Sequence, residues 1–104
     1  MRLTSEQRQV IRSLAKKHCQ EALIEVYLFG SRVNDALKGG DIDLLFVVND
    51  NDLLQLEPKI YAILNELKKE PVIGNRRIDL KLTTPKLLDS DPFLKLIKLD
   101  MLKI

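Results

Sequence analysis

The chain has few of the residues that build covalent or metal cross-links, with one cysteine and one histidine among 104 residues. Cys19 alone cannot form an internal disulfide, and one histidine cannot complete a Cys/His zinc site. Tryptophan is absent, and aromatic residues make up only 5% of the chain. Because no basic patch is interleaved with aromatic side chains, direct nucleic-acid binding is not expected.

Long apolar runs are also missing. No run approaches the ~20 residues that cross a membrane, and no apolar signal segment precedes the first predicted helix. The net charge is only +2, so the molecule as a whole does not attract polyanions. These absences predict a reduced, cytoplasmic protein that does not bind a membrane.

The remaining composition is that of an ordinary globular protein. Hydrophobic residues make up 45% and charged residues 31% of the chain, which excludes broad disorder. A chain of 104 residues is long enough for one hydrophobic core but not for two. We therefore expect a single domain over residues 1–104.

The order of helices and strands follows from hydrophobic periodicity and capping signals. Thr4 and Gln7 form a predicted capping box that starts a helix ending near Cys19 or Glu21. Further helices are expected after Ser31, over residues 57–69, and after the Thr84-Pro85 and Asp91-Pro92 pairs, and strands over 24–29, 42–48 and 77–83. This order predicts an α/β (α+β) fold, with a small mixed sheet of about three or more strands and helices packed on one face.

Three aspartates lie in two of the predicted strands. Asp41 and Asp43 share one face of the strand around 42–48, and Asp79 lies in the strand around 77–83. Carboxylates in half-buried strands repel one another and are unfavourable unless something compensates them. A divalent cation would do so, and oxygen ligands favour Mg²⁺ or Mn²⁺ over zinc. If the strands are neighbours, the pattern predicts a metal-dependent phosphoryl-transfer site with Asp79 also placed to accept a proton.

A Gly30-Ser31-Arg32 turn stands between the first two predicted strands. A helix that starts there presents free backbone N–H groups and a partial positive charge to an anion. Gly30 permits a close approach, the Ser31 hydroxyl can donate to a phosphate oxygen, and Arg32 can add a charged contact. Together with the aspartates, the turn predicts a nucleoside triphosphate site.

Two of these assignments have plain structural alternatives. Asp79 could simply pair with Arg76, Arg77 or Lys81, and Arg32 could form a salt bridge with Asp35. His18 and Cys19 are expected to be packed and inert rather than catalytic.

The order Gly-Ser, Asp-x-Asp and a third Asp on a later strand resembles the nucleotidyltransferase superfamily of the DNA polymerase β palm type. Within it, Leu-Phe-Gly-Ser-Arg and Gly-Asp-Ile-Asp-Leu-Leu resemble the minimal nucleotidyltransferase (MNT) family. The resemblance implies that Gly30 and Ser31 bind a triphosphate, that Asp41 and Asp43 ligate Mg²⁺, and that Asp79 is the third carboxylate. It also implies a helical HEPN-type toxin as partner, with the chain acting as antitoxin by transferring AMP from ATP to a hydroxyl of that toxin. The alternative is an antitoxin without catalysis that inhibits its partner by direct contact.

The C-terminal segment carries more apolar groups than one helical face can hide. About half of them are expected to close the core, and the rest to form an exposed patch that contacts a second copy or a partner protein. The residues concerned are Phe93, Leu94, Leu96, Ile97, Leu99, Met101, Leu102 and Ile104.

Overall fold

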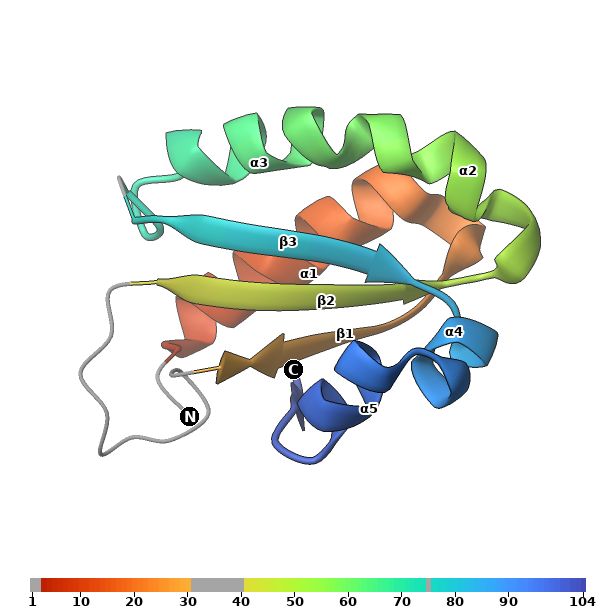
Figure 1. Cartoon of the computed structure of the whole chain (residues 1–104). Coiled ribbons are helices and arrows are strands. Elements are labelled where there is room, and N and C mark those ends of the chain that lie inside the picture. The colour runs from red at the N-terminus through yellow and green to blue at the C-terminus, as the bar shows by residue number, and fades with distance from the viewer. Residues whose placement is uncertain (1–2, 31–40, 75) are drawn as a thin grey trace.

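The computed structural model describes residues 3–30, 41–74 and 76–104. Within them, four strands form one sheet in the order β3-β2-β1-β4. The strands are β1 (Leu23–Phe29), β2 (Ile42–Val48), β3 (Ile78–Thr83) and β4 (Leu102–Lys103). β2 is parallel to β3 and antiparallel to β1, and β4 is antiparallel to β1, so the predicted mixed sheet is confirmed (Figure 1).

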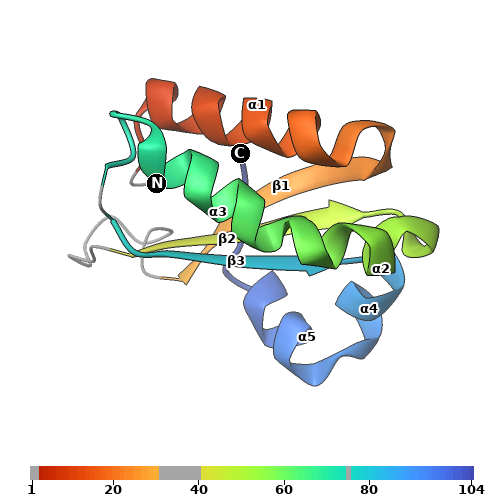
Figure 2. The same cartoon turned by 90° about the horizontal axis from the view of Figure 1, so that it is seen from above.

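Two helical layers enclose this sheet. The larger one contains α1 (Ser5–Cys19), α2 (Leu53–Leu56) and α3 (Ile60–Lys69), and it covers one face as predicted. The smaller one contains α4 (Pro85–Ser90) and α5 (Pro92–Lys98), which lie against the opposite face, so helices pack on both faces and not only on the one predicted (Figure 2). The second layer covers only part of its face, which leaves room for a site beside it.

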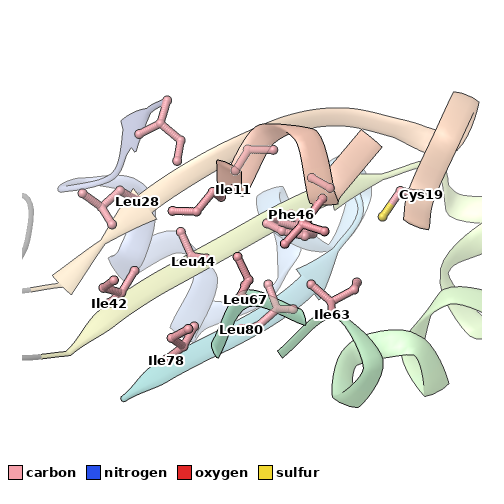
Figure 3. Close-up of a cluster of buried hydrophobic side chains, with 14 of the residues drawn as sticks. Ile11, Cys19, Leu28, Ile42, Leu44, Phe46, Ile63, Leu67, Ile78 and Leu80 are labelled. Carbon is pink, nitrogen blue, oxygen red and sulfur yellow. The ribbon is translucent and has the colours of Figure 1, made fainter. Parts of the chain in front are cut away.

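The main core lies between the sheet and the larger helical layer. Period-2 alternation sends every second side chain of β2 into it, and Phe46 is the largest fully buried one. Truncating Phe46 to Ala would cost about 3–5 kcal/mol. Figure 3 shows the convergence of helical and strand side chains, among them Ile11, Leu28, Ile42, Leu44, Phe46, Ile63, Leu67, Ile78 and Leu80.

A smaller apolar cluster fills the opposite face of the sheet. Leu45 and Val47 of β2 pack there against helices α4 and α5, so both faces of the central strand are buried at this end. The other members of the cluster are Phe29, Leu88, Leu94 and Ile97.

Local sequence signals fix most helix ends. The Thr4 hydroxyl accepts from Gln7 N (3.1 Å) and the Gln7 side chain accepts from Thr4 N (3.0 Å), which confirms the capping box. Thr84 and Asp91 cap α4 and α5, each followed by a proline in the first turn.

Two elements differ from the sequence prediction. The helical region expected from residue 57 begins earlier, because residues 50–52 form a 3₁₀ turn and α2 follows it before the 3₁₀ turn at Pro58. Strand β4 was not predicted; it pairs with Tyr27 and Leu28 and lets Ile104 N donate to Val26 O. Two residues are too short to carry an alternation signal.

The C-terminal apolar residues divide as expected between core and surface. Leu94, Ile97 and Ile104 are buried and Met101 is partly buried against the smaller cluster. The exposed members are Phe93, Leu96, Leu99 and Leu102. No helix in the described ranges has the length and apolar character that a membrane span requires.

Candidate active site

Strands β2 and β3 bring two of the three predicted aspartates side by side. Their parallel register places Asp43 opposite Asp79, and the antiparallel register with β1 places Phe29 on the other side of Asp43. Paired residues in neighbouring strands project from the same sheet face. The condition set by the sequence, that the two strands be neighbours, is therefore met.

The aspartates line one cleft at the edge where β1 ends and β2 and β3 begin (Figure 1). The cleft has a volume of about 520 Å³ and is lined by Asp41, Asp43, Arg77, Ile78 and Asp79. It lies on the face that α4 and α5 cover only in part. The carboxylates consequently stand beside a buried cluster, while the cleft itself stays open.

The arrangement shifts the pKa of the Asp43 carboxyl. Its partial burial raises the pKa of the Asp43 carboxyl above the ordinary value of 3.8, and the negative charges of Asp79 and Asp41 raise that pKa further. The positive charge of Lys81 acts in the opposite direction. The site therefore concentrates negative charge that a bound cation would neutralise.

Asp79 has a partner within the fold. Its Oδ2 atom lies 3.6 Å from Lys81 Nζ, and its side chain is 52% exposed. Of the three basic residues considered from the sequence, Lys81 forms this ion pair, whereas Arg77 lines the cleft. The pairing leaves the Asp79 carboxylate at the surface of the cleft.

Gly30 lies directly after β1, against the side chain of Asp43. Its φ of +77° belongs to the left-handed region, which favours glycine. A Cβ atom at this position would overlap Oδ2 of Asp43. The absence of a side chain at position 30 is thus what allows the Asp43 carboxylate to occupy its place.

Ser31 and Arg32, predicted with Gly30 to bind phosphate, lie outside the described residues, as does the short helix expected after Ser31. The chemistry of the described donors fits a hard divalent cation in kind, because all three are carboxylates. Among the described residues, however, no three His, Cys, Asp or Glu side chains are already grouped closely enough to hold a metal ion.

A second hollow, of about 550 Å³, lies between α1 and the beginning of β1. It is at the opposite end of β1 from Gly30, since Leu23 pairs with Val48 and Phe29 with Asp43. Arg12 lines this hollow and forms an ion pair with Glu25, with Arg12 Nη1 3.4 Å from Glu25 Oε1. This hollow holds none of the predicted site residues.

His18 and Cys19 also lie away from the cleft. His18 Nε2 is 2.9 Å from Glu66 Oε1, and Cys19 is buried in the main core, where burial raises the pKa of its thiol. Both side chains have structural roles in the described part of the chain.

With this geometry in place, the chain can be compared with known proteins. Residues 8–98 match the family described as "Nucleotidyltransferase domain". The chain belongs to this family. The match spans most of the sequence and includes β2 and β3, whose residues line the cleft, and β1 beside them.

A solved relative agrees with the family. The spectinomycin adenyltransferase AAD(9) from Enterococcus faecialis, solved with ATP and spectinomycin, aligns at 28% identity with a TM-score of 0.62. The alignment covers 84% of this nucleotidyltransferase domain but only 36% of the AAD(9) chain. The domain therefore spans about a third of the length of that relative.

Two other comparisons with known proteins add no support to the family assignment. A candidate nucleotidyltransferase from Sulfolobus solfataricus aligns over 99% of this chain and 89% of its own at 23% identity, with a TM-score of 0.49. That likeness is too weak to support an inference. No curated protein sequence matches the domain.

Sequence reasoning missed one contributor to the neighbourhood of the site. Phe93 of α5 places its ring 5.5 Å from Lys81 Nζ, so the smaller helical layer contacts the lysine that pairs with Asp79. Only the packing of α5 on the sheet creates this contact, and no local pattern in the sequence indicates it.

Proposed function

We propose that this domain transfers a nucleoside monophosphate, AMP from ATP, to an acceptor hydroxyl in an Mg²⁺-dependent reaction. The observation that carries the proposal is the pairing of Asp43 with Asp79 beside Gly30, in a chain of the nucleotidyltransferase family. ATP as donor is supported by AAD(9), the adenyltransferase solved with ATP.

Asp41, Asp43 and Asp79 are the residues that would hold the cation, with Mn²⁺ as a substitute. Mg²⁺ is commonly bound by one or two carboxylates together with substrate phosphates, so a site need not be complete before the nucleotide arrives. When bound, the cation would neutralise charge on the transferring phosphoryl group. The raised pKa of Asp43 supports this assignment, because burial and then the charges of Asp79 and Asp41 disfavour its ionised form, which a bound cation would stabilise.

The remaining roles follow from position. Gly30, Ser31 and Arg32 are proposed to bind the triphosphate at the end of β1. The acceptor oxygen attacks the α-phosphorus, and the bond between this phosphorus and the oxygen bridging to the β-phosphate breaks. Pyrophosphate leaves with the electron pair of that bond, and Asp79 accepts the hydroxyl proton. The half-exposed Asp79 carboxylate can be reached by an acceptor from solvent.

The acceptor is proposed to come from a partner protein, a HEPN-type toxin by family resemblance, which would make this domain an antitoxin. AAD(9) has about two-thirds of its chain outside the matched region, so this relative contains protein beyond the part that the domain matches. The described surface offers a contact for such a partner in Phe93, Leu96, Leu99 and Leu102, which are exposed.

A second candidate function is inhibition of the partner by contact alone. The same exposed apolar residues favour it, and so does the Asp79–Lys81 ion pair, which gives Asp79 a structural role. In that case the carboxylates would be dispensable for protection from the toxin.

Transfer of label from α-labelled ATP, with Mg²⁺ and the co-expressed partner, separates the two candidates. The enzyme predicts label on the partner and its loss in Asp43→Asn. Asp89→Asn is the matched control, because Asp89 pairs with Lys98 between α4 and α5, does not line the cleft, and has a side chain that is 71% exposed. Label that persists in Asp43→Asn, or protection without any label, would contradict the proposed catalytic role.

A further inference from the structure

We propose that Lys81 is a positioning residue, a resident positive charge that pairs with the Asp79 carboxylate and fixes it beside Asp43 before a divalent cation binds, and that competes electrostatically with that cation. The inference rests on the proposed function, because it concerns the same carboxylates. Lys81 is not part of the Gly-Ser, Asp-x-Asp and third Asp pattern.

Lys81 is held on the same sheet face as the two aspartates. It follows Asp79 by two residues in β3, and its register partner is Leu45, two residues after Asp43 in β2. Its Nζ atom lies 3.6 Å from Asp79 Oδ2, and its side chain is only 34% exposed. The stem is therefore largely covered, and the charge stands between the cleft and the buried cluster.

The second contact of the ammonium comes from α5. The Phe93 ring centroid is 5.5 Å from Nζ, within the range of a cation–π interaction. The backbone of Phe93 is held in place, because its N–H donates to Asp91 Oδ1 at 2.9 Å and the neighbouring Leu94 is buried against the sheet. Figure 2 shows α5 on the face of the sheet opposite α1 and α3.

The charge balance explains why such a residue is needed. Asp41, Asp43 and Asp79 line one cleft, and Asp43 experiences the charges of both other aspartates. Among the described residues, the charge of Lys81 acts on Asp43 in the opposite direction, and Arg77 also lines the cleft. A positive charge that offsets this repulsion must also oppose the entry of a divalent cation.

Isothermal titration with Mn²⁺ tests the competition. Lys81→Met keeps the covered stem and removes the charge, so Mn²⁺ should bind about two- to fivefold more tightly, the range of a partly exposed charge interaction. Lys81→Arg, which keeps the charge, should restore the original affinity. Lys95→Met removes an exposed charge of α5 and should leave Mn²⁺ affinity unchanged.

Unchanged or weaker Mn²⁺ binding in Lys81→Met would overturn the proposal. Weaker ATP binding at unchanged Mn²⁺ affinity would overturn it too, since the lysine would then be a triphosphate ligand.

A cycle of thermal melts in EDTA tests the positioning role without any metal. Lys81→Met should lower the melting temperature, and the loss should be less than half as large in the Asp79→Asn background. Equal losses in both backgrounds would overturn the positioning role. Failure of the unchanged chain to bind Mn²⁺ would instead contradict the proposed function, and this cycle would still decide the role of Lys81.

Discussion

Replacing Gly30 by alanine tests whether this glycine is needed to leave room for the Asp43 carboxylate as well as to adopt a positive φ. Gly30 and Gly74 both have a positive φ, of +77° and +70°. A Cβ at position 30 would overlap Asp43 Oδ2, whereas a Cβ at position 74 would meet, among the described residues, only the Pro71 carbonyl oxygen, at 4.0 Å. Gly74→Ala is therefore a matched control for backbone strain.

The two substitutions should destabilise the fold by similar amounts. An alanine in the left-handed region costs about 1–2 kcal/mol, and this cost applies at both positions. The extra collision at position 30 is with the end of a side chain, so the Asp43 carboxylate can rotate away and the fold survives. The collision should therefore lower the transfer activity and leave the stability of the fold unaffected.

The assays are thermal unfolding and nucleotidyl transfer on the same preparations. We expect similar melting temperatures for both variants, unchanged transfer by Gly74→Ala, and transfer reduced about 100-fold in Gly30→Ala, the size of effect that a misplaced catalytic group produces. Equal transfer by the two variants would refute the claim that Gly30 makes room for a functional Asp43.

Three further substitutions test other parts of the account. Asp43→Asn should abolish transfer yet raise the free energy of unfolding at pH 7 by less than about 1 kcal/mol, because it removes a carboxylate whose pKa is raised by burial and repulsion. In metal-free melts this gain in stability should vanish as the pH falls toward 3.8. A variant that is less stable than the unchanged chain at pH 7 would contradict this explanation. Burial would raise the pKa of Glu25, but the Val26 N–H, Lys103 and Arg12 together lower it below 4.5, so Glu25→Gln should cost about 0.5 kcal/mol at pH 7. Urea titrations should show that cost shrinking below pH 4.5, and a pH-independent cost would count against the ion pairs. Leu99→Glu changes a side chain that is 80% exposed, so the melting temperature should hold while co-purification with the partner is lost; an intact complex would exclude this surface.

The strands and the pairing of the aspartates could be predicted because they depend on local alternation. Ile42, Leu44 and Phe46 alternate with Asp43 and Leu45 over the span of β2, and the structure buries the first three on one face. The same alternation in β3 placed Asp79 on the face of Asp43, which the parallel register then confirmed. Capping residues fixed the start of α1 for the same reason, since the signal lies within one helical turn.

The remaining features depend on contacts between distant segments. Lys81 was one of three cations considered as partners of Asp79, and only the packed structure selects it. Phe93 reaches Lys81 because α5 folds back on the sheet, and β4 forms because the C-terminal residues meet the edge of β1. The overlap of a Cβ at Gly30 with Asp43 likewise requires the strand register that joins Phe29 to Asp43.

The central claim is that nucleotide and metal bind at the aspartate cleft, and paramagnetic broadening of amide signals by Mn²⁺ with ATP tests it most directly. We predict that signals of Gly30, Asp43 and Asp79 broaden first, at Mn²⁺ concentrations that leave the hollow between α1 and β1 unaffected. Broadening centred on Arg12 and Lys16, which line that other hollow, would contradict the account.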